Sequence, residues 1–151
     1  MLAILFVFAA LVLAMLMMFA SFSMGGGEEE VPAIFKITSI THDGTKYESN
    51  VVLLHTGTVT YNNSNLMAKF YKDDQLIHAD ILTMHGEDFI PTQHHGVQTM
   101  GGEGCSGNTW LPGERIALDF KNKMFHPDDM VTAEIYDAKT GVIISRHSYR
   151  A

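Results

Sequence analysis

The sequence contains a single cysteine, Cys105, so no intramolecular disulfide can form within the chain. It also lacks a cluster of basic residues, because 10 Lys and Arg are outnumbered by 17 Asp and Glu, which gives a formal net charge of −7. Nucleic acids and anionic membrane surfaces attract basic patches, and an acidic chain offers them none. We therefore expect no nucleic-acid partner.

Charge of either sign is missing from residues 1–27, and residues 1–24 are apolar except for Ser21 and Ser23. As a helix this segment would span about 36 Å, enough to cross the hydrocarbon core of a bilayer. No Lys or Arg precedes the apolar run, although secretory signals and ordinary membrane anchors usually carry one. We therefore expect a processed chain whose cationic leader has been removed.

Leu, Ala and Met dominate residues 1–24, and these residue types favour helix over strand. Apolar side chains would surround such a helix on every side, so it must lie in lipid or among other helices. Ala10 and Ala14 form a small-xxx-small pair that would allow close approach of a second helix. The residues expected to pack between subunits are Leu2, Ile4, Leu5, Phe6, Phe8, Ala10, Leu13, Ala14, Leu16 and Phe19.

Three glycines, Gly25, Gly26 and Gly27, follow the apolar run and predict a flexible hinge over residues 25–32. The hinge also contains three consecutive glutamates, which indicate the solvent boundary, and Pro32, which prevents a helix from resuming smoothly. We therefore expect a hydrophobic helix over residues 1–24, a hinge, and a globular domain over residues 33–151.

From Ala33 onward the pattern changes to short runs typical of β-strands, separated by turn residues. In residues 114–120, Ile116, Leu118 and Phe120 alternate with polar or small residues, the period of a half-buried strand. The predicted strands are residues 33–41, 51–55, 66–72, 76–83, 114–120, 130–136 and 142–148. We therefore predict an α+β fold in which a long N-terminal helix precedes an immunoglobulin-like antiparallel β-sandwich. Residues 86–109 have little strand character and are predicted to form a long exposed loop.

Eight histidines raise the question of a metal site. His94 and His95 lie in the predicted loop with Cys105, and His85 directly precedes it; together the four could supply soft ligands to copper or zinc. Their spacing matches no established metal-binding motif, so surface or packed histidines remain the competing interpretation. Asp73-Asp74 and Asp128-Asp129 lie in predicted turns, where aspartates accept hydrogen bonds from nearby backbone amides.

No nucleophile elbow, phosphate-binding loop or dependable Ser/His/Asp arrangement occurs in the sequence. We therefore expect no enzymatic activity and no cofactor. Asn62 begins the tripeptide Asn62-Asn63-Ser64, which fits the acceptor pattern for N-glycosylation in an exposed polar stretch.

The order of apolar segment, flexible joint and β domain resembles that of mature type IV pilins, especially the archaeal branch. The stretch Trp110-Leu111-Pro112-Gly113-Glu114-Arg115-Ile116 resembles the W-x-PG-E-x-I run of archaeal pilin-like proteins. Residues 129–137 and 140–145 resemble their following D-x-V-T-V-x-I-x-D and G-x-I-I runs, and residues 52–57 an L-x-H-x-G strand end.

This resemblance implies a major pilin that polymerises through its N-terminal helix into an extracellular filament for adhesion. It implies identical subunits as partners, a membrane-inserted precursor and a pilus assembly machinery. A subunit of the archaellum, the swimming filament, is an alternative with the same architecture. A second alternative is a monomeric, membrane-anchored β domain that binds a metal ion or a protein at the cell surface.

Overall fold

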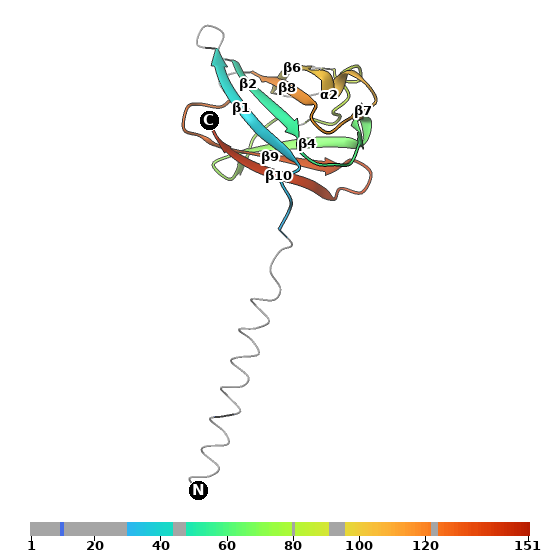
Figure 1. Cartoon of the computed structure of the whole chain (residues 1–151). Coiled ribbons are helices and arrows are strands. Elements are labelled where there is room, and N and C mark those ends of the chain that lie inside the picture. Colours follow the sequence, from blue (N-terminus) through green and yellow to red (C-terminus); the bar gives the residue numbers. More distant parts are fainter. Residues whose placement is uncertain (1–9, 11–29, 44–47, 80, 91–95, 122–123) are drawn as a thin grey trace. The chain divides into compact units, whose positions relative to one another are not determined.

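The computed structural model describes residues 10, 30–43, 48–79, 81–90, 96–121 and 124–151 (Figure 1). The chain divides into two compact units, Met1–Glu30 and Val31–Ala151. The second unit contains every described element of secondary structure except the single helical residue Ala10.

The elements of the second unit are mainly β-strands. They are β1 (Phe35–Asp43), β2 (Glu48–His55), β3 (Tyr61–Asn62), the 3-10 turn η1 (Asn63–Asn65), β4 (Leu66–Lys72), β5 (Gln75–Leu76), β6 (Val97–Gly101), α2 (Glu103–Ser106), β7 (Thr109–Trp110), β8 (Arg115–Phe120), β9 (Met130–Asp137) and β10 (Ile143–Arg150).

Two four-stranded antiparallel sheets pack against each other as a sandwich (Figure 1). Their strand orders are β1-β2-β8-β6 and β10-β9-β4-β5, and β3 pairs with β7 in a small separate ribbon. Strand β8 illustrates how the sequence produces this sandwich. Its alternate residues Ile116, Leu118 and Phe120 are fully buried on the inner face. The Phe120 ring meets that of Phe70 from the other sheet edge-on, with 4.9 Å between centroids. Apolar side chains at every second position thus hold the two sheets together.

Side chains of β10 join the two sheets where β1 and β10 run side by side (Figure 1). The buried Ser145 hydroxyl accepts hydrogen bonds from the backbone amides of Ile34 and Phe35, both at 3.0 Å. Nδ1 of His147 accepts from the Ile37 amide at 3.0 Å, and the Arg146 amide donates to the carbonyl of Pro32 at 3.0 Å. We call this junction the β1–β10 seam. It satisfies backbone groups at a sheet edge that would otherwise be unpaired.

The α+β class predicted from the sequence is wrong. The described residues form an almost entirely β fold, whose only helical elements of more than one residue are the three-residue η1 and the four-residue α2. Apolar residues in the described strands repeat at every second position, the period of a strand, and this explains why the described residues form no long helix. The predicted helix over residues 1–24 lies outside the described residues, apart from Ala10.

Two strand predictions also need correction. The predicted strand 76–83 is reduced to β5 and an isolated antiparallel bridge between Ala68 and Ile81. The predicted loop 86–109 contains β6, α2 and β7. Strand β6 forms because it pairs with β8, a tertiary contact that the local sequence does not reveal. Among the described residues, no helix is both long and apolar enough to cross a membrane.

Candidate functional site

The outer face of the β10-β9-β4-β5 sheet carries an ordered set of polar side chains. On β9, Val131, Ala133 and Ile135 belong to the core, so the alternate residues Thr132, Glu134 and Tyr136 lie on the outer face. The strand register places Lys69, Glu134 and Arg146 in one row across β4, β9 and β10. A neighbouring row contains Tyr71, Thr132 and Ser148.

Glu134 is a buried carboxylate at the centre of this face, with only 5% of its surface exposed. One oxygen lies 3.5 Å from Nε of Arg146, and the other accepts a hydrogen bond from the Tyr136 hydroxyl. Nζ of Lys69 lies 5.2 Å from the centre of the Tyr136 ring. Burying an ionised carboxylate is costly unless it is paired and hydrogen-bonded, and these neighbours meet both conditions.

The Tyr136 hydroxyl remains a hydrogen-bond donor across the physiological pH range. Burial, together with the neighbouring Glu134 and Tyr71, raises the pKa of Tyr136 well above its usual value. A phenolate beside a buried carboxylate would place two negative charges together, which explains the contribution of Glu134.

A depression of about 290 Å³ opens on this face beside Glu134. Three strands and the β4–β5 turn line it. The lining residues are Tyr71, Asp74, Thr132, Glu134, Arg146 and Ser148. Its walls therefore offer two carboxylates, one guanidinium, two small hydroxyls and a phenol ring, which supply both hydrogen-bond donors and acceptors to a polar ligand.

A second candidate surface lies at the end of the sandwich where β1 begins, which we call the proximal end. His55 organises it from the end of β2: its Nδ1 accepts from the Gly57 amide at 3.0 Å, and its Nε2 therefore donates to the Val59 carbonyl at 2.6 Å. The His55 carbonyl accepts from the amide of Gly113 at 2.8 Å. One buried histidine thus fixes the 56–60 loop and the 111–114 turn.

The Trp110–Glu114 motif forms the turn that faces His55. Trp110 is buried and stacks on Phe35, with ring centroids 4.1 Å apart. Its indole Nε1 donates to the Glu114 carbonyl at 2.9 Å, and the Glu114 carboxylate accepts from the amide of Leu111 at 2.7 Å. Gly113 has a φ of +86°, which side chains with a Cβ rarely adopt. The Trp110–Glu114 part of the pilin resemblance therefore builds the proximal end together with His55.

Three apolar side chains are exposed on separate loops of the proximal end. Val59 is 58% exposed on the 56–60 loop, Leu111 is 45% exposed beside Trp110, and Val142 is 61% exposed between β9 and β10. The pairings Phe35–His55 and Leu66–Asp137 place all of these loops at the end where β1 begins. We call Val59, Leu111 and Val142 the proximal apolar surface.

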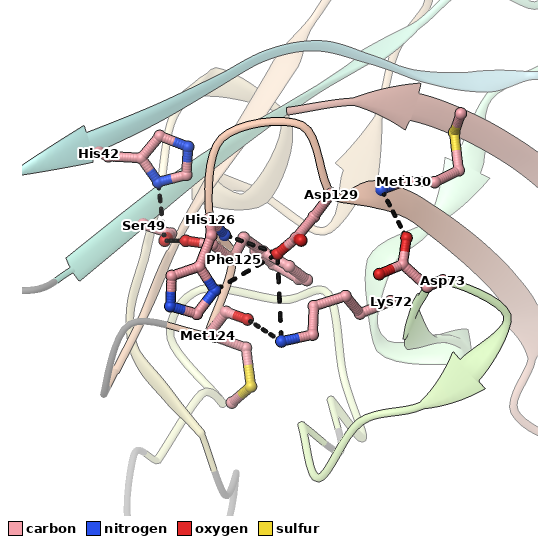
Figure 2. A network of polar contacts seen from close by, with 9 residues as sticks. All are labelled: His42, Ser49, Lys72, Asp73, Met124, Phe125, His126, Asp129 and Met130. Carbon is pink, nitrogen blue, oxygen red and sulfur yellow. Dashed lines mark hydrogen bonds and ion pairs between the residues drawn. The ribbon is translucent and has the colours of Figure 1, made fainter.

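A polar network at the opposite, distal end has a structural role (Figure 2). Ser49 donates to the carbonyl of Phe125 at 3.0 Å, and Lys72 donates to that of Met124 at 3.4 Å. The Asp129 carboxylate accepts from the His126 amide at 2.7 Å. These contacts attach the segment between β8 and β9 to both sheets.

One aspartate of each predicted turn accepts a hydrogen bond from a backbone amide; the partner of Asp129 is local, as predicted, and that of Asp73 is 57 residues away in the chain. Asp73 accepts from the amide of Met130 at 3.1 Å, and Asp129 from that of His126 (Figure 2). Asp73, Asp74 and Asp128 also have positive φ angles, which Asp tolerates better than most residues.

Two of the four predicted metal ligands lie near each other. His85 is buried, with Nε2 3.1 Å from Oδ1 of Asn108 and Nδ1 3.6 Å from Oδ2 of Asp88. Cys105 is also buried, and its carbonyl accepts from the Gly86 amide at 2.8 Å. Burial raises the pKa of the Cys105 thiol, which disfavours the thiolate that metals bind.

The other two predicted ligands, His94 and His95, lie outside the described residues. Within the described part of the chain, no three His, Cys, Asp or Glu residues come together in a way that could hold a metal ion. The metal site therefore stays a prediction.

The predicted subunit-packing residues and the hinge glycines Gly25, Gly26 and Gly27 lie outside the described residues, except for Ala10, which is exposed. Asn62 is described and exposed at the end of β3. Its side-chain oxygen accepts from the Ser64 amide at 3.1 Å and from the Ser64 hydroxyl at 2.7 Å.

Sequence reasoning missed the residues around Glu134. The strands that carry Tyr71, Glu134 and Arg146 were predicted, but apolar alternation places only Tyr71 and Glu134 opposite the core. The sequence did not reveal which strands are neighbours, because β4 pairs with β9 across 59 to 71 residues of the chain. The row of Lys69, Glu134 and Arg146 exists only through that pairing.

Neither a protein-family model nor a curated protein matches this chain. Among solved structures, it is similar to the archaellum periplasmic stator protein complex FlaF and FlaG from Sulfolobus acidocaldarius, with 14% identity and a TM-score of 0.47. That similarity covers 82% of this chain and 92% of the other.

The archaellum periplasmic stator protein FlaG from the same organism is also similar, with 16% identity and a TM-score of 0.44 over 78% of this chain and 97% of the other. Both are archaellum proteins of the archaeal cell envelope, and neither is a pilin. At these identities and TM-scores, the similarity assigns neither a function nor a partner to this chain.

Proposed function

We propose that this chain is a non-catalytic structural component of an archaeal cell-surface filament apparatus. Its β-sandwich acts by binding a different protein of that apparatus. The sequence resemblance to archaeal pilin-like proteins supports the type of apparatus, and two of the residues behind it, His55 and Trp110, help to build the proximal end.

The proximal apolar surface is the observation that carries this proposal. Val59, Leu111 and Val142 are each about half exposed or more, and they lie on three different loops at one end of the sandwich. Single exposed apolar residues are ordinary on protein surfaces, so the support for an interaction site here is that three of them share one end of the sandwich.

The loops that carry this surface are held in place before any partner arrives. His55 hydrogen-bonds to the carbonyl of Val59, and Glu114 hydrogen-bonds to the amide of Leu111. A preorganised surface loses less conformational entropy on binding, so more of the interaction energy appears as affinity.

This proposal replaces the homopolymeric pilin that the sequence suggested. Polymerisation through a long helix belongs to the α+β class, which the structure corrects. The contact proposed here involves the folded domain, and the adhesive pilus and the archaellum are the two assemblies in which to look for it. The proposed location is the cell surface.

Photo-crosslinking in intact cells tests this contact. A photoreactive phenylalanine analogue replaces Leu111 in the full-length chain, and the same analogue replaces Leu76 in a matched control. Leu76 is also apolar and is 56% exposed, but its pairing with Tyr71 near the end of β4 places it at the distal end.

We expect illumination to attach a pilus or archaellum protein to the Leu111 variant and not to the Leu76 variant. The absence of an adduct, or equal adducts at both positions, would contradict the proposal. An adduct between two copies of this chain would instead support the homopolymer.

A further inference from the structure

The depression on the outer face of the β10-β9-β4-β5 sheet offers both hydrogen-bond donors and hydrogen-bond acceptors. The hydroxyls of Thr132 and Ser148 lie 2.7 Å apart and bind each other, so one of them still has a hydrogen to donate. Arg146 approaches Glu134 through Nε, and its guanidinium carries five N–H donors, more than this single contact uses.

Asp74 supplies an available acceptor at the rim. It is exposed on the β4–β5 turn, and no described residue forms a hydrogen bond or ion pair with its carboxylate. Its neighbour Asp73 differs, because that carboxylate accepts from the amide of Met130. Asp74 is therefore the lining acid whose oxygens are open to a ligand.

The charges around the depression disfavour a simple ion. A cationic ligand would meet Arg146, whose guanidinium lines the depression. An anionic ligand would meet Asp74 and the buried carboxylate of Glu134. A neutral molecule with several hydroxyls avoids both repulsions, because each hydroxyl can donate to a carboxylate and accept from a guanidinium.

The shape of the depression indicates the size of such a molecule. Its volume of about 290 Å³ is at the lower limit of ordinary ligand pockets, which is enough for one ring. The half-buried Tyr71 provides an aromatic wall against which the C–H face of a sugar ring can pack.

We propose that this depression binds one neutral sugar ring, with Asp74 and Arg146 hydrogen-bonding its hydroxyls and Tyr71 contacting its apolar face. The ring is either a free monosaccharide or the end residue of a glycan, since both present the same chemistry. This inference does not rest on the proposed protein contact, because the depression lies on the face of the sheet and the proximal apolar surface lies on its end loops.

Binding of the full-length protein to a defined sugar panel tests the inference. The panel contains methyl glycosides of glucose, mannose, galactose and N-acetylglucosamine, and the same four sugars as end residues on a carrier protein. Glucuronic acid, glucosamine and glycine betaine represent anionic, cationic and zwitterionic ligands. Ligand-observed NMR detects weak binding of the soluble probes, and an array detects the carrier-bound sugars.

We expect at least one neutral sugar to bind with a millimolar dissociation constant, and the three charged probes to bind at least about tenfold more weakly, a difference of about 1.4 kcal/mol. Binding of the methyl glycoside shows that a free ring suffices, and binding only on the carrier identifies a glycan as the source. Either result supports the inference.

Two variants assign the binding to this depression. D74N keeps the size of the side chain and tolerates the φ of +66° at this position, so the fold should persist while the charged acceptor is lost. R146Q removes the guanidinium, and R150Q is its matched control, because Arg150 lies on the same strand and bonds to the carbonyl of Asp128 outside the depression.

We expect D74N and R146Q to weaken sugar binding at least about fivefold, about 1 kcal/mol, and R150Q to leave it unchanged. Circular dichroism confirms that each variant is folded. Preference for a charged probe, failure of every neutral sugar to bind, or unchanged binding in folded D74N would each overturn the inference.

Discussion

The backbone amide of Ile37 donates to Nδ1 of His147, and this 3.0 Å contact joins a strand of one sheet to a side chain of the other. The bond requires an unprotonated Nδ1, because a protonated imidazole has two donors and no acceptor. Burial, together with the charge of Lys36, lowers the pKa of His147 below its ordinary value of 6.5.

This relationship predicts that stability falls in mildly acidic solution. Because the pKa of His147 is lower in the folded state, the unfolded chain binds more protons, and the free energy of unfolding rises with pH. The contribution of His147 is complete above pH 6.5 and is lost as pH falls through its folded pKa. We expect H147Q to reduce the pH dependence of the melting temperature between about pH 5 and 8.

Melting curves at several pH values measure this effect in the wild type, in H147Q and in H78Q as a matched control. His78 is exposed, and its replacement removes one histidine without touching the β1–β10 seam. An H147Q profile that runs parallel to that of the wild type would contradict the prediction.

Ser145 should contribute more than His147 to the stability of the β1–β10 seam. Its hydroxyl is buried and accepts from two backbone amides, so S145A leaves both donors without that partner. We expect S145A to lower the free energy of unfolding by about 1–3 kcal/mol. Urea denaturation followed by the fluorescence of Trp110, the single tryptophan, measures the change. The control is S106A, which removes an exposed hydroxyl bonded within α2, and an equal loss in both variants would contradict the assignment.

Gly104 and Gly107 form a matched pair for testing packing against Trp110. A Cβ on Gly104 would lie 2.6 Å from two atoms of the Trp110 indole and 2.8 Å from the Ile116 side chain. A Cβ on Gly107 would meet no atom within 4 Å. We expect G104A to destabilise the domain by about 1–3 kcal/mol and G107A to change stability by less than about 0.5 kcal/mol. Similar urea midpoints for the two variants would contradict this packing.

Asn62 is expected to carry an N-linked glycan in the native protein. Asn62 is exposed, and the Ser64 hydroxyl donates a hydrogen bond to its side-chain oxygen. This bond holds together the asparagine and the serine of the glycosylation tripeptide. Mass spectrometry of peptides from protein purified from its natural source should show a glycan at Asn62 and none in S64A. Unmodified Asn62 in the native protein would contradict the prediction.

Strands with clear alternation were the part of the fold that could be predicted from sequence. Leu66–Lys72 was predicted as a strand and is β4, and the inward positions of Ile116, Leu118 and Phe120 are confirmed. Strand β6 was missed because Val97 is its only fully buried residue and its pairing with β8 decides its conformation. Local patterns record burial on one strand, whereas pairing depends on residues that are distant in the chain.

The candidate sites likewise depend on contacts between distant segments, which the sequence does not reveal. Trp110 and His55 were noted only as parts of a resemblance, and their shared role at the proximal end follows from contacts between residues that are 55 and 58 positions apart. Glu134 and Arg146 were ordinary charged residues in the sequence. The depression that they line requires three strands in register, which no single segment specifies.

The β1–β10 seam also determines how the domain bears a mechanical load. Tension applied at Val31 enters β1, which is bonded to β2 in one sheet and, through Ser145 and His147, to β10 in the other. The Pro32 carbonyl adds a bond to the amide of Arg146 close to the point where the force enters. A pull on β1 therefore reaches both sheets from the first residues of the domain.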